Sequence, residues 1–102
     1  MYYTYMIRCE DNSIYTGITT DLTRRMEEHF SKSEKCAKYT FRHDAKKLER
    51  AWSSYDRKCA SKLEYHIKRL PKVKKETLIK SPEKLDDYLG EKIDTKEYEV
   101  YK

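Results

Sequence analysis

The chain has 102 residues, of which 40% are charged and 37% hydrophobic, and ten tyrosines supply most of its aromatic side chains. This length predicts one domain with a modest core, and two glycines and two prolines are too few for a low-complexity or collagen-like chain. No apolar run approaches the roughly 20 residues that a membrane-spanning helix needs, so we expect no membrane partner.

Positive charge is concentrated in the first 80 residues. Residues 1–80 hold 19 Lys and Arg against 11 Asp and Glu, a net +8, whereas residues 81–102 hold 4 against 7, a net −3. A basic body favours nucleic acid as partner, because binding releases counterions from the phosphates; lysines that serve only solubility explain it equally well. We predict a domain over 1–80 and an acidic extension over 81–102, which is either solvated or folded back on the basic face.

The three cysteines, Cys9, Cys36 and Cys59, are far apart and form no C-x-x-C pair. They predict neither a disulfide framework nor a zinc site. A reducing compartment fits this pattern, and we expect a cytoplasmic protein.

The N-terminal residues predict a β-hairpin. Residues 2–9 are rich in aromatic and β-branched types with a period of two, residues 10–13 form a turn cluster, and residues 14–16 continue as the returning strand. This pairing brings Tyr5 and Tyr15 close together. Gly17 ends the second strand, where glycine permits a close approach that a side chain would block.

The next predicted element is an amphipathic helix that runs to about Phe30. Thr19, Thr20 and Asp21 are N-cap candidates, and Leu22, Met26 and Phe30 lie four residues apart on one stripe. With Leu22 at zero, a rotation of about 100° per residue places Arg25 and His29 at the border of the stripe and Arg24 in solvent. We therefore expect Arg25 to face the tyrosines, whereas Arg24 reaches at most a distant phosphate.

Residues 31–46 are polar and basic, and they predict a loop or a short helix around Glu34–Lys38. Lys35, Lys38, Tyr39 and Arg42 have the chemistry to grip a nucleic-acid backbone and to stack on a base. A solvated connection whose aromatic side chains anchor it to the core is an equally good interpretation.

The following segment predicts a third strand over residues 48–55 and a helix over residues 57–70. Glu64 lies about 40° from Ala60 on this helix, at the edge of its apolar stripe. A carboxylate at that position is costly to desolvate without a cation, a metal or several donors. It is therefore either one half of an ion pair or a metal ligand.

The C-terminal part predicts two short helices and an open end. Pro71 fits the first position of a helix to about Ile79, Ser81-Pro82 begins another, and Gly90 ends it. Residues 93–101 are either an extra strand or a frayed tail.

In their order and spacing, these residues resemble the GIY-YIG nuclease superfamily over roughly residues 2–79. The string from Ser13 to Leu22 is similar to that of its small, single-domain bacterial members. The residues that carry the resemblance are Tyr3-Thr4-Tyr5, Tyr15-Thr16-Gly17, Arg24-Arg25, Glu28-His29, Ala37-Lys38-Tyr39-Thr40 and Glu64-Tyr65-His66-Ile67-Lys68.

The resemblance implies an α+β fold, a three-stranded antiparallel sheet flanked by helices, and one divalent metal, Mg²⁺ or Mn²⁺, held by Glu64. It also implies DNA hydrolysis by a single in-line displacement. One of Tyr5 and Tyr15 would help to activate water, Arg25 would neutralise charge on the phosphate, and the role of His29 stays open. We place among the nucleic-acid contacts Gly17, Arg24, Lys35, Lys38, Tyr39 and Arg42.

The small size predicts structure-selective or unspecific cutting of branched, damaged or single-stranded DNA, in repair or recombination. Two positions depart from common family usage: Ile18 stands where many members carry lysine, and Glu76-Thr77 stands where many carry asparagine. A non-catalytic nucleic-acid-binding module that keeps the fold is therefore the second interpretation. An interaction domain whose Glu64 is only ion-paired is the third.

Overall fold

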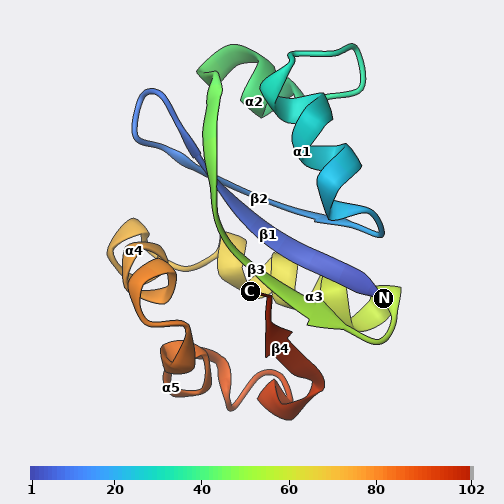
Figure 1. The fold of residues 1–102 in the computed structure, drawn as a ribbon. Coiled ribbons are helices and arrows are strands. Elements are labelled where there is room, and N and C mark those ends of the chain that lie inside the picture. Colours follow the sequence, from blue (N-terminus) through green and yellow to red (C-terminus); the bar gives the residue numbers. More distant parts are fainter. Residues whose placement is uncertain (102) are drawn as a thin grey trace.

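A computed structural model describes residues 1–101 as one antiparallel sheet with helices on both faces (Figure 1). The strand order is β2-β1-β3-β4. The strands are β1 (Tyr2–Cys9), β2 (Ile14–Thr19), β3 (Ala45–Ser54) and β4 (Tyr98–Val100). The helices are α1 (Leu22–Phe30), α2 (Lys38–His43), α3 (Arg57–Lys68), α4 (Lys72–Lys80) and α5 (Leu85–Leu89), with 3₁₀ turns at Pro82–Lys84 and Thr95–Glu97.

The predicted α+β class is confirmed, but the sheet has four strands and not three. The additional strand, β4, pairs antiparallel with the end of β3, so that Tyr98 lies opposite Ser54. The buried Tyr98 hydroxyl donates to the Cys59 carbonyl oxygen at 2.7 Å, which ties this strand to α3. Charged and apolar residues alternate over 93–101, a pattern that left an extra strand and a frayed tail both open; only Tyr98–Val100 form the strand.

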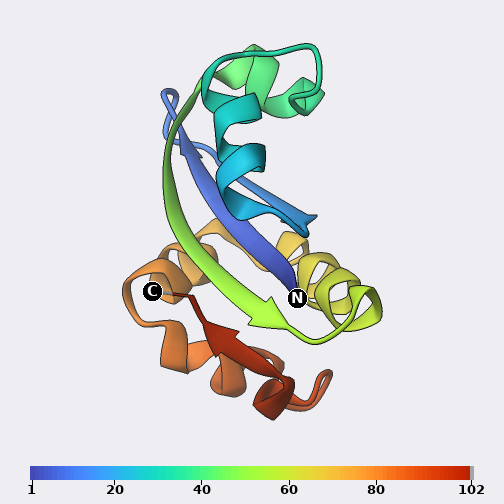
Figure 2. The ribbon, with the colours of Figure 1, turned by 45° about the vertical axis from the view of Figure 1, so that its right-hand side comes forward.

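The two faces of the sheet carry two cores because successive side chains of a strand point to opposite sides. Tyr5 and Ile7 face α1, where they pack with Leu22 and Met26. Met6 lies in the other core, which α3, α4 and α5 cover. In the molecule as a whole, α1 and α2 lie at one end, and α4, α5 and β4 lie at the other (Figures 1 and 2).

The last residues contribute to the larger core. Leu85, Leu89 and Ile93 are buried together with Met6 and Trp52. Separation of residues 81–102 as an extension stays a prediction about domain organisation; their apolar side chains share a core with the sheet.

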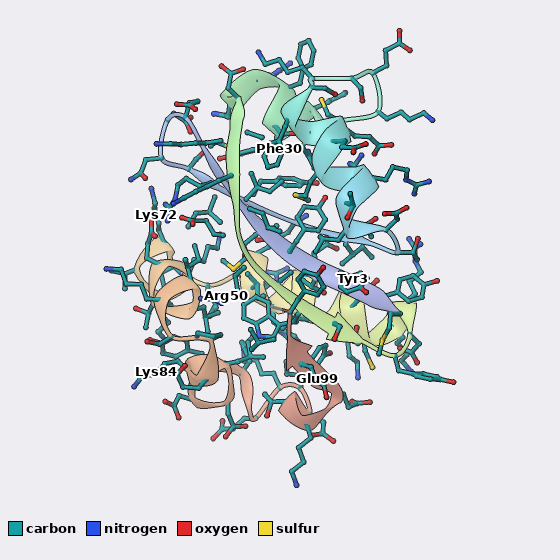
Figure 3. The ribbon with its side chains drawn as sticks, in the orientation of Figure 1. Tyr3, Phe30, Arg50, Lys72, Lys84 and Glu99 are labelled. Atoms are coloured by element: carbon teal, nitrogen blue, oxygen red, sulfur yellow. The ribbon has the colours of Figure 1, made fainter. Side chains whose placement is uncertain are left out.

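Three local predictions were wrong. The third strand begins at Ala45, before the residue 48 we expected, and the short helix lies over Lys38–His43 instead of around Glu34–Lys38. On α1, His29 is buried together with Leu22 and Met26, whereas Phe30, which we expected on their stripe, is 43% exposed (Figure 3). The polar contacts of His29, described below, favour its burial over that of its apolar neighbour.

The three cysteines are free thiols, with Cys9 and Cys59 buried and Cys36 partly exposed. Between residues 1 and 101, no helix combines the length and the apolar character that crossing a membrane requires.

Candidate active site

Gly17 lies directly opposite Tyr5 in the β1–β2 pairing, near the edge of the sheet. A Cβ atom at Gly17 would lie 2.5 Å from the Tyr5 hydroxyl oxygen and 3.1 Å from a ring carbon of Tyr15. The absence of a side chain at this position therefore allows both tyrosine rings to approach the Gly17 backbone closely. The reason for this glycine is close approach, since its φ is not positive.

We expect Gly17→Ala to destabilise the fold by about 1–3 kcal/mol, the usual cost of adding a methyl group to a packed site. Tyr5 has little freedom to move away because it is 1% exposed. Urea unfolding of Gly17→Ala beside the wild type measures the loss, and the same substitution in a Tyr5→Phe background should cost less. Equal losses in both backgrounds would show that the clash is not with the Tyr5 hydroxyl.

A chain of hydrogen bonds connects Tyr5 to α2 through a histidine that is fully buried. The Tyr5 hydroxyl lies 2.8 Å from Nε2 of His29, and Nδ1 of His29 lies 2.7 Å from Oγ1 of Thr40. The Thr40 hydroxyl donates to the Ala37 carbonyl at 3.1 Å, so its oxygen accepts from Nδ1–H of His29. Nε2 is then the unprotonated nitrogen, and it accepts the Tyr5 proton.

Burial fixes the charge state of this pair. It raises the pKa of Tyr5 to about 12, against the opposing effect of the Arg25 hydrogen bond. Burial, reinforced by the nearby Arg25 charge, lowers the pKa of His29 to about 4. At neutral pH, Tyr5 is therefore a phenol, His29 is a neutral imidazole, and the shared proton resides on Tyr5.

The lowered pKa of His29 predicts a loss of stability in acid. Unfolded His29 protonates near its ordinary pKa of about 6.5, so from that pH down to about 4 the unfolded state binds more protons and stability falls. The two values differ by an amount worth roughly 3 kcal/mol. Urea unfolding from pH 7 to pH 4 should show a steeper decline for the wild type than for His29→Gln, and parallel declines would contradict the assignment.

Arg25 approaches the same hydroxyl from α1. Its Nε lies 3.4 Å from the Tyr5 oxygen, and its Nη1 donates to the Glu28 carboxylate at 2.8 Å and to the Lys35 carbonyl at 2.5 Å. These contacts hold the guanidinium at the border of the buried face. The neighbouring Arg24 side chain is exposed, and its backbone N–H donates to the Asp21 cap at 3.1 Å.

Tyr15 is the more accessible of the two tyrosines. It is partly buried on β2, its ring lies 6.3 Å from that of Tyr5, and it makes no hydrogen bond through its hydroxyl to any residue of the described chain. The Lys68 ammonium lies 5.7 Å from its ring centroid. A water or a phosphate can therefore reach the Tyr15 hydroxyl.

Glu64 comes to this edge from α3, on the other face of the sheet. Its side chain is 25% exposed and lies 3.4 Å from the Lys68 ammonium, one turn further along the helix. Its charge is one of the influences that raise the pKa of Tyr5. The site therefore joins both faces across the exposed edge of β2, with Tyr5, Tyr15, Arg25 and His29 on one side and Glu64 on the other.

Glu64 is the carboxylate that would hold a divalent metal at this site. Within residues 1–101, no three His, Cys, Asp or Glu side chains gather in a group able to hold a metal ion. Mg²⁺ often uses only one or two carboxylates, and it fills its remaining positions with water and substrate phosphate. A partly exposed glutamate beside accessible tyrosine and arginine groups fits that kind of site.

The predicted nucleic-acid residues of 35–42 begin beside Arg25, which donates to the Lys35 carbonyl. Lys35, Lys38 and Arg42 are exposed, and the last two line a depression of about 470 Å³. The Tyr39 ring stacks on Tyr15, with centroids 5.7 Å apart, and on His43, with centroids 4.2 Å apart. A base would have to displace one of these partners to stack on Tyr39.

The sequence reasoning missed two residues at the site, Thr40 and Lys68. The i,i+4 spacing of Glu64 and Lys68 was a visible signal, whereas nothing in the sequence connected Thr40 to His29. The role of Glu76 was not predicted either. Its carboxylate pairs with Arg8, and Glu49 binds the same guanidinium at 3.0 Å. Glu76 therefore connects α4 to β1.

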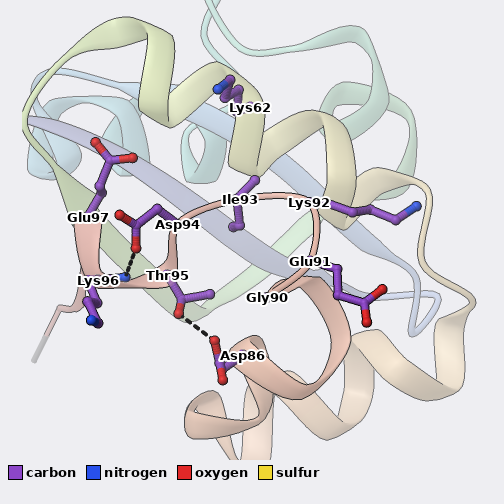
Figure 4. A pocket seen from close by; sticks show the side chains of 10 residues that line it. All are labelled: Lys62, Asp86, Gly90, Glu91, Lys92, Ile93, Asp94, Thr95, Lys96 and Glu97. Atoms are coloured by element: carbon purple, nitrogen blue, oxygen red, sulfur yellow. Dashed lines mark hydrogen bonds between the residues drawn. The ribbon is translucent and has the colours of Figure 1, made fainter.

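A second depression, of about 460 Å³, lies between the middle of α3 and residues 86–97 (Figure 4). Lys62 and the acidic tail residues line it, and Thr95 donates to Asp86 at 2.7 Å across it. The tail carboxylates of this groove lie beside the middle of α3, at the end of the molecule opposite α1 (Figure 1).

Comparisons with known proteins agree with this geometry. A family model described as the GIY-YIG catalytic domain matches residues 1–77. The chain is 49% identical over 82 residues to UPF0213 protein FN1575 of Fusobacterium nucleatum, covering 80% of each chain. It is 40% identical over 89 residues to UPF0213 protein YhbQ of Salmonella arizonae, covering 87% of each. The solution NMR structure of UPF0213 protein BH0048 from Bacillus halodurans matches with a TM-score of 0.50 and 40% identity, over 78% of this chain and 84% of that one.

Proposed function

Because the chain belongs to the GIY-YIG nuclease superfamily, we propose that it is a divalent-metal-dependent endonuclease that hydrolyses DNA phosphodiester bonds. The observation that carries this proposal is the meeting of phenols, a guanidinium and a carboxylate at the β2 edge: Arg25 lies 3.4 Å from the Tyr5 hydroxyl, and Lys68, which lies over the Tyr15 ring, also contacts the Glu64 carboxylate. DNA repair or recombination is the process, and the cytoplasm the compartment, that we propose with it.

Arg25 has the position to stabilise the reacting phosphate. Its guanidinium lies between the Tyr5 hydroxyl and the exposed surface, and Glu28 and the Lys35 carbonyl fix its orientation. Negative charge accumulates on the phosphate oxygens during in-line displacement, so a preorganised cation at this place lowers the barrier. Preorganisation is worth more here because the guanidinium is partly desolvated.

Tyr15 is the tyrosine that we propose to contact the attacking water. Its hydroxyl is accessible, whereas that of Tyr5 is committed to His29 and Arg25. The Lys68 ammonium lies 5.7 Å from the Tyr15 ring centroid, so a cation is available near this tyrosine to attract the phosphate. We assign Tyr5 and His29 to positioning, because their pKa values of about 12 and about 4 keep the proton on Tyr5.

Glu64 is the residue that would hold Mg²⁺ or Mn²⁺. Its carboxylate lies at the edge of the site, and its only close cation among the described residues is the partly exposed Lys68. A bound divalent ion supplies Lewis-acid stabilisation of the leaving oxygen. Release of Glu64 from Lys68 is cheap, because an i,i+4 pair at the surface is worth about 0.3–0.5 kcal/mol.

The test is incubation of the purified protein with nicked, branched and single-stranded DNA in Mg²⁺ or Mn²⁺, with an EDTA reaction beside each. We expect cleavage that requires the metal and that is either structure-selective or unspecific, because a domain of this small size favours few contacts in the grooves. Equal cleavage in EDTA would contradict the metal requirement.

A non-catalytic nucleic-acid-binding module is the second candidate function. Two observations favour it: Ile18 offers no amine beside Gly17, and Glu76 is engaged by Arg8. This function predicts salt-dependent DNA binding without metal-dependent cleavage, so the same experiment separates the two candidates.

A further inference from the structure

Tyr39 on α2 stacks on two other rings. Its ring centroid lies 5.7 Å from that of Tyr15 on β2, with 27° between the ring planes, and 4.2 Å from that of His43, with 23° between the planes. Tyr39 and His43 are four residues apart on α2, a spacing that places two side chains next to each other on a helix surface. The three rings therefore form a continuous stack that leads from α2 to the proposed nuclease site.

The β1–β2 turn holds the outer end of this stack. The Asp11 carboxylate accepts a hydrogen bond from Nδ1 of His43 and another from the Ser13 backbone N–H at 3.1 Å. A second contact joins the same two segments, because the Glu10 backbone N–H donates to the Asp44 carbonyl at 2.8 Å, directly after α2. The turn thus keeps the His43 ring in place, although 37% of this side chain is exposed.

Ring contacts orient the Tyr15 side chain. Its hydroxyl has no hydrogen-bond partner within residues 1–101, so the packing of the ring sets the direction of the oxygen. The His29 ring lies 5.6 Å away between centroids and is fixed by hydrogen bonds at both nitrogens. The stacked neighbour is Tyr39, and the ring stacked on Tyr39 in turn is His43. A change at His43 therefore reaches Tyr15 through Tyr39.

We propose that His43 is a positioning residue for Tyr15. Held by Asp11, its ring keeps Tyr39 stacked against Tyr15 and so fixes the Tyr15 hydroxyl at the β2 edge. This inference rests on the proposed function, in which Tyr15 contacts the attacking water. A displacement of about 1 Å at a reacting group can cost about a hundredfold in rate, so the support of a ring that does not itself touch the substrate is sufficient to affect cleavage.

The first measurement follows the Tyr15 ring by NMR in protein with ¹³C-labelled tyrosine rings, and Tyr15→Phe identifies the Tyr15 signals. His43→Ala removes the end of the stack and keeps a good helix former in α2. His43→Phe keeps a ring beside Tyr39. The matched control is Tyr101→Ala, which removes a half-exposed ring that lies 5.5 Å from Tyr3 between centroids.

We expect His43→Ala to shift the Tyr15 signals, because loss of the supporting ring lets Tyr39 move. His43→Phe should restore most of the wild-type positions, and Tyr101→Ala should leave the Tyr15 signals unchanged. Circular dichroism verifies that each variant folds. Unchanged Tyr15 signals in folded His43→Ala would overturn the inference.

The second measurement is single-turnover cleavage of a nicked duplex in Mg²⁺. We expect His43→Ala to be about tenfold slower, with unchanged DNA affinity in EDTA, because His43 acts through the tyrosine and not on the DNA. In a Tyr15→Phe background the same substitution should cost nothing further, since the hydroxyl that it positions is absent. An equal loss in both backgrounds would assign His43 to the stability of α2 and overturn its positioning role.

These experiments separate this inference from the proposed function. A wild type that does not cut DNA would contradict the nuclease, and the Tyr15 signals would still decide whether His43 positions that ring. A wild type that cuts DNA at a rate that His43→Ala leaves unchanged would contradict the positioning role alone.

Discussion

Replacement of Arg25 by alanine should reduce the rate of DNA cleavage by about 10²–10³, the usual effect of removing one preorganised donor from a transition state. The guanidinium is the nearest described cation to the Tyr5 hydroxyl, at 3.4 Å, and it is held there by Glu28. Single-turnover cleavage of a labelled nicked duplex at saturating protein measures this rate without a contribution from binding.

Arg24→Ala is the matched control, since the two arginines are adjacent and differ mainly in the direction of their side chains. Arg24 is exposed and contacts at most a distant phosphate, so its loss should weaken DNA binding slightly and leave the single-turnover rate within about twofold. Because Arg25 also binds the Lys35 carbonyl, circular dichroism should verify that both variants fold. Equal rates for the two variants would contradict the assignment of Arg25.

Replacement of Glu64 by glutamine should abolish metal-dependent cleavage, with a loss of at least about 10²-fold. A metal ion at a phosphoryl group supplies several kcal/mol, and about 1.4 kcal/mol corresponds to tenfold in rate. The fold should change little, because the variant loses only the partly exposed contact with Lys68. DNA binding in EDTA should be unchanged or tighter, because a negative charge near the phosphates is removed.

Glu27→Gln, on the exposed face of α1, is the control for the loss of one carboxylate. A second readout is thermal unfolding with and without Mn²⁺: wild type and Glu27→Gln should be stabilised by the metal, and Glu64→Gln should not. If Mn²⁺ stabilises Glu64→Gln as strongly as wild type, the metal lies elsewhere.

Much of the fold was predictable because periodicity and turn residues act locally. The hairpin and the long α3 helix were expected at nearly the observed bounds, and the α1 cap is Asp21, one of the three candidates at residues 19–21. The orientation of Arg25 followed from the helical angle alone. These features depend on residues that are close in sequence, where the spacing of side chains fixes the direction of each one.

The remainder depends on contacts between distant segments. Burial of His29 instead of Phe30 requires Thr40, eleven positions further on, to accept its Nδ1 proton. Addition of β4 to the sheet depends on the contact between Tyr98 and α3. The placement of Lys68 above Tyr15 requires α3 to cross β2. Local sequence patterns do not predict that crossing.

The most direct test of a phosphodiesterase site at the β2 edge is the single-turnover rate of cleavage of one nicked duplex in Mg²⁺. The proteins compared are wild type, Arg24→Ala, Arg25→Ala, Glu27→Gln and Glu64→Gln. The site described here predicts that wild type, Arg24→Ala and Glu27→Gln cut the DNA at similar rates. Arg25→Ala and Glu64→Gln should each fall by at least about a hundredfold. Cleavage that survives both of the last two substitutions would contradict a phosphodiesterase site at the β2 edge.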